Sequence, residues 1–295
     1  MLFDRVCNLV IGKTNTQGFS FNQDFRISFD VQKSLTNTPK YSKLEIYNLS
    51  QTTRDALQKL ISSNNENINN QEVVMLYAGY SFNVGAELLY SGNIVNISSR
   101  KEPPDVITTI SCAENALVYK NSFSALSYSG GVNSTKIITD IAAQMQVPID
   151  DNSNYGTSVT FAHGWSHAGL TKNAMDKIAR QAGLTWSTQN GKIRLVPYGN
   201  STNEQDVVVV SSTTGMIGSP ERKDSSGDET DNPAMKHGWK VKSLLQPKLS
   251  PNKRVKIESM NVNGIYIIDT VSHTGDTKVG DWQTEFEIKD QQVTQ

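Results

Sequence analysis

The stretch Phe-Arg-Ile-Ser-Phe-Asp-Val-Gln at residues 25–32 alternates strictly between apolar and polar side chains. In an extended chain its four apolar side chains lie on one face and its polar side chains on the other. This period of two predicts a half-buried β-strand. The same alternation returns near the other end of the chain, at residues 282–288, and predicts a second such strand there.

The region around the first of these strands, up to residue 112, is mostly strand-like. One helix interrupts it, because Ser50 can cap a short helix that carries Ala56 and Leu57 on its apolar side. The polar run at residues 62–70 predicts a loop. One helix among about five strands is typical of a small barrel or sandwich. The other strands predicted in this region cover residues 44–47, 73–80, 88–98 and 106–112.

The middle region, residues 113–210, has a different pattern. Apolar residues at helical spacing cover residues 137–145, and Pro148 ends that helix. A second apolar stripe covers residues 170–182, and Gly183 is well placed as its carboxy-terminal cap. This spacing predicts two amphipathic helices.

After the second helix, Asn190-Gly191 lies between two strand-like runs and predicts a hairpin, because both residues tolerate positive φ. From residue 211 the pattern is strand-like again, with a turn predicted at Asn263-Gly264. We therefore expect an α+β, mainly β fold whose three domains cover residues 1–112, 113–210 and 211–295.

The composition excludes several classes of protein. The chain has 295 residues, with 28 basic and 29 acidic side chains and a formal net charge of −1. A nucleic-acid-binding protein would concentrate Lys and Arg on one face, so this balance argues against that class. No apolar stretch approaches the ~20 residues that span a bilayer, and the amino terminus lacks the features of a signal peptide. We expect a protein that is made in the cytoplasm and does not enter a membrane.

Two cysteines, Cys7 and Cys112, lie far apart and form no CxxC pair. We expect buried thiols rather than a disulfide or a metal site. No glycine-rich phosphate-binding motif occurs in the sequence. The sequence therefore predicts neither a cofactor nor a metal.

His163 and His167 are the residues that most resemble a catalytic or metal-binding pair. Four residues apart, they would share one face of a helix, but Gly164 stands where a metalloprotease carries its catalytic Glu. Ser166 nearly fits a nucleophile elbow, except that Ala168 replaces the final Gly and no parallel sheet is predicted. We interpret both histidines as polar loop residues and predict no enzyme activity.

The stretch 221–232 is rich in acidic residues, serine and glycine. The spacing of its acids does not follow a calcium-binding EF-hand loop, so we interpret it as a solvated loop. Trp186 and Trp282 occupy alternating strand positions, which predicts that both are core aromatics.

Several short segments follow one another in order and together span nearly the whole chain. Asn252 follows Pro251, and Asn tolerates the left-handed conformation of a turn. The segments are Phe29-x-Val31-x-Lys33, Leu44-Glu45-Ile46-Tyr47-Asn48-Leu49-Ser50, Val74-x-Leu76-x-Ala78-Gly79-Tyr80, Leu89-Tyr90-Ser91-Gly92, Gly183-Leu184-x-Trp186, Thr214-Gly215-Met216-Ile217-Gly218-Ser219-Pro220, His273-x-Gly275-Asp276-Thr277 and Trp282-x-Thr284.

This series resembles the hub family of contractile injection systems. Members of that family cap the tail tube in phage baseplates and form the amino-terminal hub of type VI secretion spike proteins. The resemblance implies two tail-tube-like antiparallel β-barrel domains with an α+β domain inserted between them. It also implies a homotrimer with pseudo-six-fold symmetry, with the tail tube protein above, the spike protein below and other baseplate proteins around it. DNA would pass through the lumen without specific binding, in a virion tail baseplate assembled in the bacterial host cytoplasm.

Leu244, Leu245 and Pro247 are the candidate residues for a subunit or tube interface. For the two leucines a place in the core of their own chain is the favoured interpretation, because apolar residues at strand ends usually pack internally. The alternative function is a tail-associated cell-wall hydrolase, and a carbohydrate-binding β protein is a further possibility. The residues do not distinguish a phage tail from a tailocin or a type VI apparatus.

Overall fold

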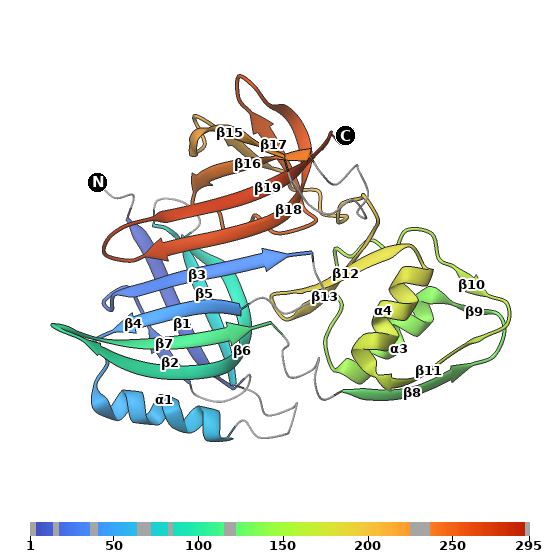
Figure 1. Ribbon diagram of the computed structural model, residues 1–295, viewed down its shortest axis with the longest axis horizontal. Helices are drawn as coiled ribbons and strands as arrows, with labels where there is room; N and C mark the ends of the chain where they lie inside the picture. Colours follow the sequence, from blue (N-terminus) through green and yellow to red (C-terminus); the bar gives the residue numbers. More distant parts are fainter. Residues whose placement is uncertain are drawn as a thin grey trace.

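The computed structural model describes residues 4–13, 18–35, 41–63, 72–81, 85–114, 122–224 and 237–292. In these ranges the protein is mainly β, with three α-helices and one large, mostly antiparallel sheet. Figure 1 shows the large sheet on one side of the molecule and a smaller α+β unit beside it. None of the described helices is long and apolar enough to cross a membrane.

The amino-terminal part of the large sheet, here called the first half-sheet, develops from the alternating stretch at residues 25–32. Ile27, Phe29 and Val31 are buried, as the period of two predicts. Helix α1 (Gln51–Ser63) packs on this half against β6, and the hydroxyl of Ser50 caps it by accepting a bond from the Thr53 amide at 3.1 Å. The strands, in sheet order, are β3 (Ile27–Ser34), β4 (Tyr41–Tyr47), β7 (Asp105–Ala113), β6 (Gly85–Glu102), β5 (Glu72–Tyr80), β1 (Arg5–Lys13) and β2 (Phe19–Phe21).

The carboxy-terminal part, the second half-sheet, has an apolar core of its own that includes Val255, Ile268 and Phe286. Its strands are β15 (Met216–Asp224), β16 (His237–Leu244), β19 (Trp282–Gln292), β18 (Asn263–Asp276), β17 (Arg254–Glu258) and β14 (Val208–Ser211). The last of these pairs in parallel with β17, while the other pairs are antiparallel.

The α+β unit has a separate core, built around Ile138, Met175 and Trp186. Figure 1 shows its two helices side by side, with the β12–β13 hairpin reaching from them toward the large sheet. Its elements are β8 (Phe123–Tyr128), β9 (Val132–Asn133), α3 (Ser134–Met145), β10 (Thr160–Phe161), β11 (Trp165–Leu170), α4 (Thr171–Gln181), β12 (Leu184–Gln189) and β13 (Lys192–Pro197).

The turn predicted at Asn263-Gly264 is wrong, because both residues belong to β18 and pair with Glu258 and Ile257 of β17. At the other predicted turns the residues adopt the conformations that their chemistry favours. Gly183 follows α4 with φ 69°, and the hairpin residues Asn190 and Gly191 have φ 51° and 79°. Asn252 is left-handed with φ 65°. Local turn signals of this kind can be read from sequence because they depend on one residue's allowed backbone angles.

The mainly β, α+β character is confirmed, and so is the burial of Trp186 and Trp282, each 4% exposed. Within the described ranges, 13 strands form one branched sheet and the others form three two-stranded sheets, and no closed barrel is found. The loop predicted at 221–232 is wrong for Glu221–Asp224, which extend β15 by pairing with β16, and residues 225–232 lie outside the described ranges. Of the loop predicted at 62–70, the first two residues belong to α1 and the others lie outside the described ranges.

Candidate functional site: the junction of the two half-sheets

The two half-sheets meet where β3 pairs with β18. The register is antiparallel and extends from Ser34 opposite Thr270 to Ser28 opposite Asp276. Strand β18 is long enough to pair with β17 over residues 263–267 and with β3 over residues 270–276, while β19 pairs with it along most of its length. Because a backbone ladder crosses the junction, the two halves are held as one continuous sheet.

Close aromatic packing fills the junction on its apolar side. The rings of Phe29 on β3 and Trp282 on β19 meet edge to face, with centroids 5.2 Å apart. Gly275 lies between them, and a Cβ atom there would lie 2.3 Å from Phe29 and 2.7 Å from Trp282. Position 275 therefore requires glycine, because the two rings leave no room for a Cβ atom.

A polar network closes the other side of the junction around Asp276. Its carboxylate accepts a bond from Arg26 Nε at 3.0 Å and from the backbone amides of Lys278 and Val279 at 2.8 and 3.1 Å. Arg5 donates to the Asp276 carbonyl at 2.6 Å and to the Gly280 carbonyl at 2.9 Å. Two arginines from the amino-terminal end of the chain thus hold the β18–β19 turn.

His273 lies inside the junction and is fully buried. Its Nδ1 is 2.9 Å from the hydroxyl of Thr284 on β19. Burial lowers the pKa of His273 well below its ordinary value of 6.5, and the nearby positive charge of Lys33 lowers this pKa further. The imidazole is therefore neutral at physiological pH.

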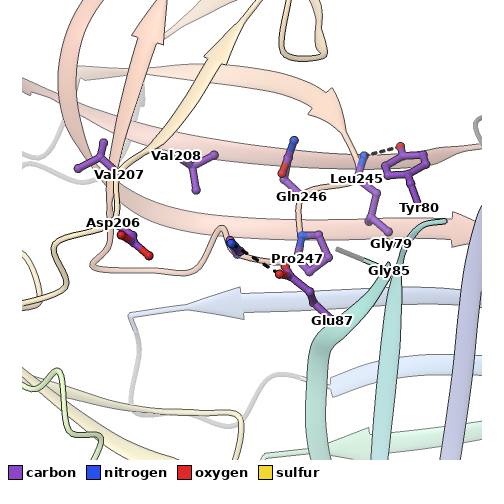
Figure 2. A pocket seen from close by; sticks show the side chains of 11 residues that line it. Gly79, Tyr80, Gly85, Glu87, Asp206, Val207, Val208, Leu245, Gln246 and Pro247 are labelled. Atoms are coloured by element: carbon purple, nitrogen blue, oxygen red, sulfur yellow. Dashed lines mark hydrogen bonds and ion pairs between the residues drawn. The ribbon is translucent and has the colours of Figure 1, made fainter. Parts of the chain in front are cut away.

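A pocket of about 350 Å³ opens beside the junction. Figure 2 shows Tyr80 pointing toward Leu245, whose backbone amide donates to the Tyr80 hydroxyl at 3.1 Å. Lys248, which also lines the pocket, forms an ion pair with Glu87 at 3.6 Å. The pocket is thus bounded by polar contacts between the first half-sheet and the segment after β16. Its lining residues are Gly79, Tyr80, Gly85, Glu87, Asp206, Val207, Val208, Leu245, Gln246, Pro247 and Lys248.

The three residues predicted as an interface lie at this pocket or next to it. Leu245 and Pro247 line it; Leu245 is only 1% exposed, and Pro247 is half-buried. Leu244 ends β16, lies against Gly215 and donates its amide to the Gly215 carbonyl at 2.8 Å.

The histidine pair does not form a site. His163 is exposed in a turn, as predicted, but the prediction of a loop is wrong for His167, which lies on β11. His167 stacks on Trp165 with ring centroids 6.2 Å apart, because alternate residues of a strand share a face. Ser166 is exposed on the same antiparallel strand, which is not the strand-turn-helix of a nucleophile elbow. Over the described residues, no cluster of three or more potential metal ligands is found.

Cys7 and Cys112 are buried free thiols, as the sequence predicts. Burial raises the pKa of Cys7 to about 12 and raises the pKa of Cys112 further still. Both thiols therefore stay protonated and unreactive at neutral pH.

The sequence did not reveal the roles of Tyr80, Gly275 and Asp276. Each lies in a segment that carries the family resemblance, but their partners are distant along the chain: Leu245 is 165 residues from Tyr80, and Arg26 is 250 residues from Asp276. A tyrosine at the end of an apolar strand and a Gly-Asp pair before a turn were the available signals. Neither signal names its partner.

The fold is similar to several solved structures. The 43 kDa tail protein of prophage MuSo2 from Shewanella oneidensis is 9% identical, with 95% of this chain and 96% of that chain covered and a TM-score of 0.62. A tail protein from Neisseria meningitidis MC58 is 10% identical, with 98% and 97% covered and a TM-score of 0.63. The E. coli c3393 protein is 8% identical, with 95% and 76% covered and a TM-score of 0.59. That protein is a component of the type VI secretion system with structural similarity to the T4 tail proteins gp27 and gp5.

No curated protein sequence matches the chain. The model of the family described as baseplate hub gp41, however, matches residues 8–274, which is most of the chain. The match includes most of the first half-sheet, the α+β unit and the second half-sheet up to residue 274, so that β19 lies outside it. The chain therefore belongs to the baseplate hub gp41 family and is a structural component of the baseplate of a phage tail or related contractile system.

Proposed function

We propose that three copies of this chain form the central ring of the baseplate and join a six-fold tail tube to a three-fold spike. The observation that carries this proposal is the edge-to-edge pairing of β3 with β18, which gives one chain two successive half-sheets. Three such chains offer six half-sheets around a ring, and six positions can match the symmetry of a hexameric tube.

Each half-sheet is proposed to be one tail-tube-like unit, with residues 1–112 and 211–295 as two domains and residues 113–210 as the inserted α+β domain. Three apolar clusters support this division, and the first of them also includes Leu245 and Trp282 from residues 211–295. Strand β14, at residues 208–211, pairs with β17, so the third unit includes the end of the preceding segment.

The ends of the sheet are proposed to pair between neighbouring copies. Strand β15 lies at one end and pairs with β16 alone among the described strands, while β2 lies at the other end. Ile217 on β15 is 40% exposed, which is high for a large apolar side chain in a strand. Edge strands with open backbone groups are ready to add a further strand, and a ring of three copies would bury them.

Leu244, Leu245 and Pro247 are proposed to support a contact with a neighbouring subunit or with the tube protein. Leu245 is buried in the first half-sheet's core and would anchor the segment that follows it. The pocket places Pro247 beside the Lys248–Glu87 ion pair, so this contact surface would be mixed rather than purely apolar.

The partners would be a tail tube protein above, a spike protein below and further baseplate proteins around the ring. DNA would pass through the lumen without binding, since the net charge of −1 gives no excess of cations to hold phosphates. A ring whose inner wall is strongly basic would contradict this part of the proposal.

A cryo-EM map of the assembled tail tests the proposal. We expect three copies of the chain between the last tube ring and the spike, each contributing both half-sheets to one pseudo-six-fold layer. Six copies of the chain in that layer, or a position of the chain at the periphery of the baseplate, would refute the proposal that a trimer joins the six-fold tube to the three-fold spike. Clearing of a peptidoglycan suspension by the purified chain would favour the hydrolase alternative instead.

A further inference from the structure

The α+β unit, here called the arm (residues 122–197), contacts the large sheet through polar groups. Within the described residues, the apolar cluster of the arm shares no member with the clusters of the two half-sheets. In Figure 1 the β12–β13 hairpin is the part of the arm that reaches the sheet. An interface without a shared apolar core permits relative motion of the two parts.

The tip of this hairpin contacts two buried ionisable residues, one on β3 and one directly after the end of β7. Lys33 on β3 donates to the side-chain oxygen of Asn190 at 2.9 Å, and the backbone amide of Asn190 donates to Glu114 Oε1 at 3.1 Å. Lys33 is 4% exposed and Glu114 is 7% exposed. Gln189 adds a bond to the Ser34 carbonyl at 3.1 Å. Asn190 therefore bridges a buried cation and a buried anion, in addition to forming the turn.

Further charged groups surround this contact. Arg194 on β13 pairs with Asp150 at 2.8 Å and reaches the sheet through the Ser250 hydroxyl at 2.8 Å and the Pro251 carbonyl at 3.0 Å. Lys253 pairs with Glu204 at 2.8 Å. His273 of the second half-sheet is neutral and also lies within the field of Lys33.

We propose that the arm is a movable unit, docked on the sheet by a weak latch in which the Asn190 tip inserts between Lys33 and Glu114, and that it can leave the sheet while both half-sheets stay folded. The latch is weak because docking removes both charges from water without bringing them into a direct ion pair. Desolvation of two such groups can exceed the attraction between them. This property does not depend on the proposed trimer.

The titration of the two groups supports a weak latch. Burial raises the pKa of Glu114 from its ordinary 4.5, although Lys33, the Asn190 amide and Arg194 oppose the rise. Burial lowers the pKa of Lys33 from its ordinary 10.5; Glu114 opposes this, while Arg194 and Lys253 add to it.

A raised carboxyl pKa contributes stability that is present at low pH and is lost as the pH rises through it. A lowered lysine pKa contributes stability that is present at high pH and is lost as the pH falls through it. Both contributions are missing near neutral pH, where docking is weakest.

Hydrogen exchange of the full-length chain tests the latch. Two amides are followed as reporters: that of Asn190 in the arm, bonded to Glu114, and that of Thr202 in the segment that follows the arm, bonded to the Asn252 carbonyl at 3.0 Å. The double variant K33Q/E114Q keeps hydrogen-bonding groups but removes both charges. We expect its two reporter amides to exchange about tenfold more slowly than those of wild type at neutral pH.

The single variants K33Q and E114Q each leave one buried charge without its counter-charge, so their reporter amides should exchange faster than those of the double variant. The control is K256Q/E258Q, which removes an exposed ion pair of the same residue types on β17 and should change nothing. Amides of the β3–β18 ladder should keep their protection throughout. Unchanged or faster exchange in K33Q/E114Q, or equal changes in the reporters and the β3–β18 ladder, would overturn the proposal.

Discussion

At Gly275 the absence of a side chain allows Phe29 and Trp282 to meet across the junction of the half-sheets. We expect Gly275→Ala to reduce the free energy of unfolding by about 1–3 kcal/mol, because the added methyl group overlaps both rings. Urea denaturation measures this change. In a Phe29→Leu background the same substitution should cost less, since the smaller side chain leaves room. Equal costs in the two backgrounds would mean that the aromatic contact does not set the requirement for glycine.

His273 gives the junction a pH dependence whose sign follows from burial. Its pKa is lowered in the folded state, so its contribution to stability is present above the unfolded pKa of 6.5 and is lost as the pH falls below it. Below pH 6.5 we expect wild type to lose about 1.4 kcal/mol per pH unit more than His273→Gln. Urea denaturation at several pH values measures both slopes, and any constant cost of the substitution cancels. Parallel slopes would show that His273 takes up a proton within the fold.

At the scale of elements, local chemistry was readable from the sequence. The alternation at residues 25–32, the helical stripes and the turn residues Gly183 and Asn190 each depend on neighbouring positions, and each predicted the element that forms. The prediction was wrong where pairing decided the outcome. Glu221–Asp224 looks like loop on composition, yet it becomes strand because β16 supplies its partner. His167 likewise becomes strand because β8 pairs with it.

Asn133 tests how far a local cap stabilises the arm. It precedes α3 with extended backbone angles, and its side-chain oxygen accepts a bond from the Lys136 amide at 2.8 Å. Replacement by Ala should lower the stability of the arm by about 1 kcal/mol, whereas Ser should retain most of it. Thermal unfolding followed by Trp186 fluorescence measures both variants. If Asn133→Ser costs as much as Asn133→Ala, the capping bond is not the source of the stability.

For the whole molecule, the sequence predicted the class and the family, but it could not place the junction. The contacts of Asp276 with Arg5 and Arg26 join residues near the two ends of the chain. Hydrophobic periodicity reflects neighbouring positions only, so it cannot predict such long-range contacts. The proposed interface residues show the same limit. The sequence singled out Leu245 and Pro247, but only the fold places them beside Tyr80 and Glu87 in one pocket.

If copies of the chain assemble through the end strand β15, a charge placed on that strand should weaken the trimer. Ile217 is exposed in one copy and would be buried if β15 paired with a neighbour. Ile217→Asp places a charge in that contact, so we expect at least about tenfold weaker trimer formation, because burying an unpaired charge is costly. Multi-angle light scattering over a range of concentrations measures the trimer fraction.

Met260→Asp is the matched control, because Met260 is fully exposed in the turn between β17 and β18 and is not assigned to the interface. Its trimer should therefore match that of wild type. Circular dichroism must show the same β content in both variants, so that lost assembly is not lost folding. A wild-type chain that stays monomeric at every concentration, or equal trimer fractions for Ile217→Asp and wild type, would rule out β15 as the edge that closes the ring.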